Sequence, residues 1–195
     1  MDFKKLREDL SSITDIIYFD SNQYLREKSS NLSKLKQFII KTEVFLEQIK
    51  EDALINKEEK YFLYGTLGNL YRIYGEPKIS INYLELNLKY AIEEKLYKKE
   101  IISLIRLGEA LKYDNKLEEA LEKFNLALVR CEETDENSHL DFAFQHKGKC
   151  LLELNRLEDA MNCFQSALEL RKSKGNSSLI YSTEQAIEFA QNIQN

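Results

Sequence analysis

Hydrophobic residues recur at helical spacing along most of this chain. In one stretch Leu104, Leu107 and Leu111 fall at positions i, i+3 and i+7. Such spacing places apolar side chains along one face of an α-helix. The 195 residues include a single proline and six glycines, and so few helix breakers favour long helices over many short strands. The pattern therefore predicts an all-α protein.

The hydrophobic pattern itself repeats every 40 residues. Gly68, Gly108 and Gly148 occupy the same position in three consecutive copies. Each copy reads as two helices joined by turn residues, such as Asp114-Asn115-Lys116, which favour tight turns through local side-chain bonding. A glycine that recurs inside a helix indicates that another helix approaches closely there. Repeats of this kind predict a solenoid in which each unit buries its apolar face against the next.

The second helix of each copy carries the residues that identify the repeat. Its small and aromatic positions are Ala120, Phe124, Ala127 and Leu128 in one copy and Ala160, Phe164, Ala167 and Leu168 in the next. With the Leu-Gly pair of the first helix, this pattern resembles the tetratricopeptide repeat over about residues 58–170. Because the period is 40 rather than 34 residues, the chain is most similar to the long-helix subgroup of cell-polarity adaptors, kinesin light chains and Rap-type regulators. HEAT and armadillo repeats have a comparable period but lack this residue set.

The resemblance implies a right-handed superhelical solenoid of helix hairpins in three segments. Residues 1–57 would form an N-terminal helical segment that could include a degenerate repeat. Residues 58–175 would form three tetratricopeptide hairpins, and residues 176–195 a C-terminal capping helix with a polar outer face. In the first segment an apolar stripe from Phe3 to Ile17 predicts one helix, and a stripe from Leu35 to Ile49 predicts another, with Asn31 near its start. A DNA-binding helix-turn-helix is the alternative there, but the segment lacks clustered basic residues.

In proteins that this chain resembles, the first helix of each hairpin lines a concave groove that holds a protein or peptide. The residues beside the core stripe are then the candidates for partner binding, and their mixture of aromatic, aliphatic and charged groups suits an extended peptide or a helix. Asn69 could bond to a ligand backbone, and Arg72 and Arg106 could pair with a carboxylate. The candidates are Phe62, Asn69, Arg72, Ile73, Ile102, Ile105, Arg106, Glu109, Lys112, Tyr113, Phe142, Gln145, His146 and Lys149.

The carboxylate-clamp adaptors of chaperones use a Lys/Asn/Asn/Lys/Arg set in this groove, and only Asn69 matches it. Gly65, Arg106, Phe142 and His146 occupy the other places. We therefore expect no binding to a chaperone C-terminus of that type.

Catalytic and metal-binding motifs are missing from the sequence. There is no glycine-rich phosphate loop, no serine elbow and no paired Cys-x-x-Cys. His146 and Cys150 share one helical turn and Cys163 lies on the partner helix, but no fourth metal ligand is evident. Buried cysteine is also a common packing residue. We therefore predict a protein that is not an enzyme and that has no cofactor and no metal.

The charge narrows the class of partner. The formal net charge is −5 and the pI is about 5.3, whereas nucleic-acid binders usually carry basic patches. The acidic excess lies wholly in residues 58–195 and includes the loop from Glu132 to Asp141. We therefore expect no nucleic-acid partner. An alternative to the adaptor is a regulatory binder, either a peptide sensor or an acidic immunity-type protein that neutralises a basic partner.

The cysteines and the hydropathy bear on location. Three cysteines, at an odd count and without framework spacing, are typical of a reducing compartment. No apolar run approaches the roughly 18 residues that a membrane span needs. The sequence thus predicts a cytoplasmic protein with no membrane partner. Solenoid faces can also self-associate, so a homodimer is possible.

Overall fold

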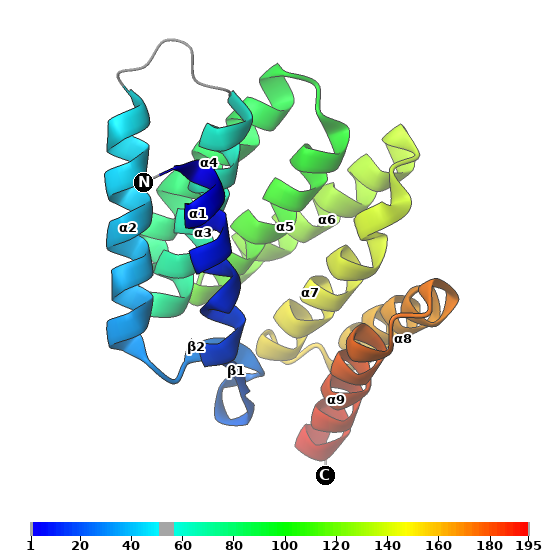
Figure 1. The fold of residues 1–195 in the computed structure, drawn as a ribbon. Coiled ribbons are helices and arrows are strands. Elements are labelled where there is room, and N and C mark those ends of the chain that lie inside the picture. The colour runs from blue at the N-terminus through cyan, green and yellow to red at the C-terminus, as the bar shows by residue number, and fades with distance from the viewer. Residues whose placement is uncertain (1, 51–56, 195) are drawn as a thin grey trace.

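Three helix hairpins stack side by side and are flanked by helices at both ends (Figure 1). This computed structural model describes residues 2–50 and 57–194. The hairpins are α3–α4, α5–α6 and α7–α8, with α9 packed on α8. The elements are α1 (Phe3–Ser11), β1 (Ile17–Asp20), β2 (Arg26–Ser29), α2 (Leu32–Lys50), α3 (Lys57–Tyr74), α4 (Pro77–Glu93), α5 (Tyr97–Tyr113), α6 (Leu117–Thr134), α7 (Leu140–Glu153), α8 (Leu157–Lys174) and α9 (Ser177–Gln194), with 3₁₀ helices at Ser12–Ile16, Ser21–Gln23 and Asn137–His139. The all-α repeat solenoid is confirmed, while the hand of its superhelix stays a prediction.

The recurring glycines hold the two helices of each hairpin together. A Cβ atom at Gly108 on α5 would lie 2.6 Å from Cε1 of Phe124 on α6, and one at Gly148 would lie 2.6 Å from Cε1 of Phe164. Real Cβ atoms do not approach carbon so closely, so a larger residue would push the helices apart. The aromatic ring of the second helix therefore packs directly on the backbone of the first.

Besides the equivalent close approach at Gly68, the first hairpin makes a second one at Gly65. Asn87, which stands where the later copies have alanine, is fully buried on α4. A Cβ atom at Gly65 on α3 would lie 2.9 Å from Nδ2 of Asn87. The later copies instead pair a larger residue, Ile105 or Gln145, with the small alanine. In the first copy the larger side chain is therefore on the second helix, whereas in the later copies it is on the first helix. The space between the two helices is filled in each case.

The N-terminal segment differs from its prediction. The apolar stripe predicted a helix through Ile17, but α1 ends at Ser11 and Ile17 begins a strand. Hydroxyl groups explain the ending, because Ser11 Oγ donates to the carbonyl of Glu8 (2.6 Å) and Ser12 Oγ to that of Asp9 (3.0 Å). Such local bonds compete with helix continuation. The β-branched and aromatic run that follows favours a strand instead.

The two strands form one antiparallel hairpin, called here the β-hairpin (residues 17–29). Ile17 pairs with Ser29, and Asp20 pairs with Arg26. Its turn contains two consecutive non-glycine residues in the left-handed region, Tyr24 (φ 51°) and Leu25 (φ 57°), a conformation that costs free energy. The chain then enters α2, where Asn31, expected near the start of this helix, is the N-cap and its Oδ1 accepts from the Lys34 amide (2.9 Å).

Candidate functional site

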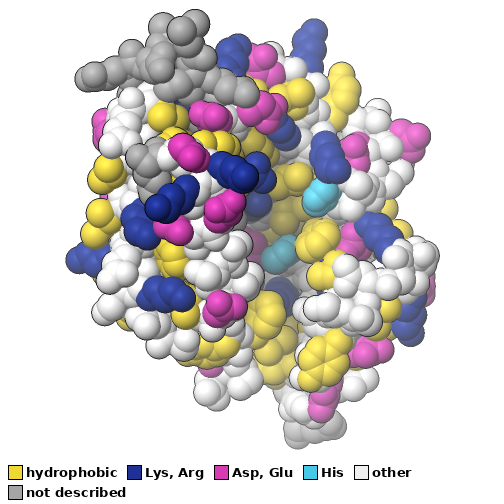
Figure 2. Space-filling view, in the orientation of Figure 1, with side chains coloured by type: hydrophobic (Ala, Val, Ile, Leu, Met, Phe, Trp, Pro, Cys, Tyr) yellow, Lys and Arg dark blue, Asp and Glu magenta, His cyan; other side chains and the backbone are white. Residues whose placement is uncertain are grey.

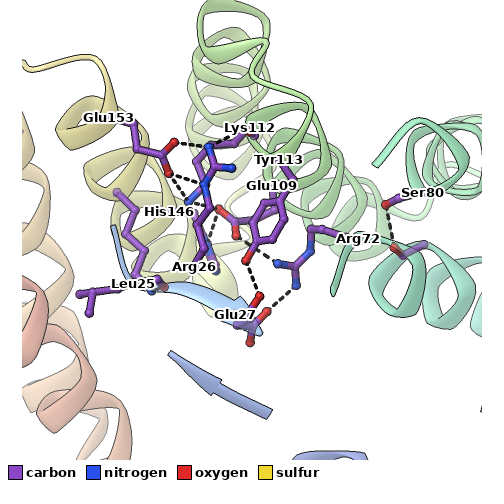
Figure 3. Close-up of polar contacts among 12 residues, drawn as sticks. Leu25, Arg26, Glu27, Arg72, Ser80, Glu109, Lys112, Tyr113, His146 and Glu153 are labelled. Carbon is purple, nitrogen blue, oxygen red and sulfur yellow. Dashed lines mark hydrogen bonds and ion pairs between the residues drawn. The ribbon is translucent and has the colours of Figure 1, made fainter. Parts of the chain in front are cut away.

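The concave side of the solenoid is lined by α3, α5 and α7, and the β-hairpin lies against it (Figure 3). All predicted groove residues lie on these three helices. The β-hairpin was not foreseen as their neighbour, and it brings Leu25, Arg26 and Glu27 into the groove.

Glu27 binds the first-copy end of the groove. Its carboxylate pairs with Arg72, and its carbonyl oxygen accepts a hydrogen bond from the Tyr113 hydroxyl (3.1 Å). The Arg72 guanidinium carbon also lies 4.7 Å from the centre of the Tyr113 ring, within the range of a cation–π contact. Burial opposes the charge on Arg72, which is 5% exposed, but the neighbouring Glu27 carboxylate holds the arginine pKa above its ordinary value.

Arg26 binds the opposite wall. It pairs with Glu153 at the end of α7 and donates to the carbonyl of Lys112 (2.9 Å). The buried Lys112 ammonium lies 3.4 Å from Oε1 of Glu153 and 3.2 Å from Oε1 of Glu109. The β-hairpin is therefore tied to both α5 and α7 through charged groups.

Glu109 is the acidic centre of this cluster. His146 Nδ1 lies 3.0 Å from Oε1 of Glu109, and Arg72 Nη1 lies 3.7 Å from its Oε2. Burial disfavours the charged carboxylate, yet Lys112 and His146 hold the pKa of Glu109 well below its usual range. Glu109 is thus an ionised, paired carboxylate at neutral pH, which makes it a structural anion and a poor general base.

Three members of this cluster were missed by sequence reasoning. Arg26 and Glu27 lie outside the repeat, and nothing in their local pattern points to the groove. Glu153 could have been found, because it stands 40 residues after Tyr113 and 80 after Ile73, both predicted groove residues.

Part of the groove remains open beside the segment that the β-hairpin covers. Figure 2 shows a hollow at the centre of this face, bordered by hydrophobic and histidine side chains. A pocket of about 450 Å³, called here the front pocket, lies between α3 and the N-terminal segment. Its α3 wall includes the predicted residues Phe62, Asn69 and Ile73. Across from them, the Arg7 guanidinium carbon lies 5.0 Å from the centre of the Phe62 ring.

Arg106 on α5 is a half-buried groove residue without a counter-charge. Within residues 2–50 and 57–194 it makes no ion pair or hydrogen bond. Burial lowers its pKa, and the nearby positive charge of Arg72 adds to that effect. Its Nη1 would lie 2.7 Å from a Cβ atom at Gly65, so the absence of a side chain there gives the guanidinium its place.

The predicted groove residues fall into two classes according to the exposure of their side chains. Phe62, Asn69, Ile73, Ile102, Arg106, Tyr113, Phe142 and His146 are half-buried, and Arg72, Ile105, Glu109, Lys112, Gln145 and Lys149 are buried. The sequence suggested an open groove for all of them. The charged members of the buried group are covered largely because the β-hairpin lies over that part of the groove.

The cysteines and His146 do not converge on one point. Among the residues that the structure describes there is no group of three metal-ligating side chains. Cys150 is fully buried and its Sγ donates to the carbonyl of Leu117 (3.3 Å), and burial raises the pKa of this thiol to about 12. Cys131, Cys150 and Cys163 are all free and buried.

The acidic segment from the end of α6 to the start of α7 is largely engaged in internal contacts. Asp141 is fully buried and pairs with Arg171 and Lys174. Glu133 pairs with Arg130, and Glu136 accepts from the Ser138 amide. These contacts leave less unpaired negative charge on the surface than the loop's sequence suggests.

Comparison with known proteins supports the fold. No protein-family model matches the chain, and a search of curated proteins found no match. Among solved structures, the apo form of RapI matches at a TM-score of 0.73 with 16% identity over 98% of this chain. The match covers 63% of RapI, so the chain spans less than two thirds of that protein.

Two further structures carry the repeat in their descriptions. The TPR domain of Arabidopsis FLU matches at a TM-score of 0.56 with 20% identity, over 60% of this chain and 99% of that domain. TPR-like repeats of a candidate kinesin light chain from Podosopora anserina match at 0.65 with 10% identity, over 96% of this chain and 86% of that one. No helix in the described residues is long and apolar enough to cross a membrane. Identities this low bear on the fold alone, and the chain therefore has a tetratricopeptide-type helical repeat fold.

Proposed function

We propose that this protein binds a segment of another protein in the part of the concave groove that the β-hairpin leaves open. The front pocket carries this proposal. Its volume of about 450 Å³ suits a large apolar side chain with its flanking backbone, since ligand pockets span roughly 300–1,000 Å³. Phe62 and Ile73 provide apolar walls, and Asn69 offers a donor and an acceptor to a peptide backbone.

Arg106 supports the same assignment. A half-buried guanidinium that lacks an anion is costly, and a carboxylate on the partner would compensate it. The β-hairpin illustrates the chemistry, because its β2 strand is an extended segment whose Glu27 carboxylate pairs with a groove arginine and whose backbone accepts from Tyr113. A partner segment that carries an apolar anchor and a carboxylate would use the front pocket and Arg106 in the same manner.

We propose that this role is non-catalytic. Glu109, the central carboxylate of the groove, lies within ion-pair distance of Lys112 and His146. These neighbours hold the pKa of Glu109 well below its usual range, so this carboxylate is a poor acceptor for a substrate proton. The free buried cysteines are consistent with a reducing compartment such as the cytoplasm.

A regulatory binder, such as a peptide sensor or an immunity-type protein, is the alternative role for the same fold. An immunity-type protein would bind a basic partner through exposed acids, and its complex would weaken steeply with salt. The internal pairing of the acidic segment around Asp141 argues against an immunity-type protein.

The proposal is tested by photo-crosslinking in extract of the native cell. A crosslinking amino acid at Ile102, in the groove, should capture a defined partner, whereas one at Val129, exposed on α6, should not.

The double variant Asn69→Ala/Arg106→Ala should lose the partner. Asn125→Ala/Arg156→Ala makes the same two changes beside the α6–α8 pocket and should retain it. A partner kept by the groove variant but lost at high salt would instead favour the basic-partner alternative.

A further inference from the structure

A second cavity lies away from the front pocket, between the β-hairpin and α9. We call it the rear cleft. Phe19 and Leu25 of the β-hairpin form one side, and Ser178, Tyr181 and Ser182 of α9 form the other, with Lys149 of α7 also lining it. Its volume is about 410 Å³, which is large enough for a small aromatic molecule or a terminal residue of a peptide.

Among the residues that the structure describes, Lys149 is the one cation that lines this cavity. It is 5% exposed, and its Nζ donates to the carbonyl of Leu25 (3.3 Å) and lies 4.4 Å from the centre of the Phe19 ring. Within the described part of the chain it forms no ion pair with a carboxylate, unlike Arg26, Arg72 and Lys112. An ammonium has three donors and is costly to bury without an anion.

The remaining walls of the rear cleft are neutral and aromatic. No acidic residue is among the described residues that line it. Ser178 and Ser182 contribute hydroxyl groups, while Phe19 and Tyr181 are 52% and 64% exposed. Exposed aromatic side chains beside a buried cation are suited to a ligand that joins an aromatic ring to an anionic group.

We propose that the rear cleft binds an aromatic carboxylate, with the carboxylate paired to Lys149 and the ring between Phe19 and Tyr181. A free aryl carboxylate and the C-terminal carboxylate of a peptide ending in phenylalanine share this chemistry. This site lies outside the front pocket and does not depend on the function proposed for that pocket.

The test is a titration of the full chain followed by ¹H–¹⁵N NMR at neutral pH. One arm uses 3-phenylpropionate and its neutral amide, and the other uses acetyl-Gly-Gly-Phe with a free or an amidated C-terminus. We expect saturable shifts in α9 and the β-hairpin with a carboxylate probe, and at least about tenfold weaker binding of the matching amide. Binding in both arms identifies a site for free carboxylates, and binding in the peptide arm alone identifies a site for a chain terminus.

Substitutions test whether Lys149 is the cation that pairs with the carboxylate of the ligand. Lys149→Met should weaken binding at least about tenfold, whereas Lys89→Met, which removes an exposed lysine of α4 outside the rear cleft, should leave it unchanged. Tyr181→Ala should weaken binding because it removes one of the two rings that contact the ligand. It should leave the fold intact because the Tyr181 side chain is exposed. The proposal is overturned by the absence of saturable shifts up to about 10 mM probe, by equal binding of acid and amide, or by unaltered binding in a folded Lys149→Met protein.

Discussion

Arg72 on α3 and Glu27 on β2 form an ion pair between residues that lie 45 positions apart in the sequence. The Arg72 side chain is 6% exposed and that of Glu27 is 31% exposed. A carboxylate of the kind expected from a partner is thus supplied by the chain itself. The β-hairpin is therefore an integral part of the folded groove, because without it the guanidinium would keep only the Glu109 carboxylate, 3.7 Å away, as a counter-charge.

Glu27→Gln should lower the free energy of unfolding by about 1–3 kcal/mol, since it leaves Arg72 buried without its main anion. The partial exposure of Glu27 keeps the expected loss below that of a fully buried pair. Urea unfolding measures the change. Glu133→Gln is the matched control, because its pair with Arg130 is 55% exposed on the acidic side and should contribute at most about 1 kcal/mol. Equal losses in the two variants would contradict this account of the β-hairpin.

Gly108→Ala should destabilise the protein by about 1–3 kcal/mol, although alanine is the better helix former. The added methyl group would meet the Phe124 ring at 2.6 Å. Thermal and urea unfolding of Gly108→Ala, Phe124→Ala and the double variant test the cause, because the two losses should be less than additive once the ring that meets the methyl group is gone. Asn125→Ala on the exposed side of α6 should change stability by about 0.5 kcal/mol or less. A stabilised Gly108→Ala protein would refute the close packing.

Asp141→Asn should detach α9 from the third hairpin. Asp141 is fully buried, and the Arg171 side chain that it pairs with is 2% exposed and also donates to Thr183 on α9. Leaving that guanidinium without an anion should cost about 3–5 kcal/mol, and hydrogen exchange should show α9 amides losing protection first. Asp159→Asn breaks a pair whose two side chains are 50% exposed and should cost at most about 1 kcal/mol. Uniform loss of protection in Asp141→Asn would argue against a local role.

The repeat could be predicted because each of its packing contacts is encoded within one 40-residue unit. Gly108 and Phe124 lie 16 residues apart, and the same spacing recurs at Gly148 and Phe164. Alignment of the copies also shows that the first one combines a small Gly65 with a larger Asn87, the reverse of the arrangement in the later copies. Local spacing is sufficient there since the two helices of a hairpin contact each other wherever the hairpin lies.

The occupied part of the groove could not be predicted in this way. The partners of Arg26 and Glu27 lie as far as 127 and 86 residues away, and no periodicity links a strand to a repeat helix. The stripe from Phe3 to Ile17 also satisfied helical spacing, although local hydroxyl bonds end the helix at Ser11. Which groove residues are buried was therefore decided by tertiary contacts.

Lys149 should make stability depend on pH in a defined direction. Burial, and then repulsion by Lys112, lowers its pKa from 10.5 to about 8. Between these two values the unfolded chain binds more protons than the folded one, so the contribution of this lysine to stability rises with pH. Relative to Lys149→Met, the wild-type protein should gain about 2 kcal/mol in unfolding free energy between pH 7 and about pH 9.5.

Comparing the two proteins isolates the lysine, because its other charged neighbours are present in both. These neighbours are Lys112 and Glu109 on α5, Glu27 on β2 and Arg72 on α3. Lys89→Met, which removes an exposed lysine of α4, is the control for the loss of one positive charge from the protein. The difference in unfolding free energy between the wild-type and Lys149→Met proteins could instead stay constant with pH. That result would mean that the charge of Lys149 is already balanced in the folded protein, and the rear cleft would then lack the charge that attracts a carboxylate.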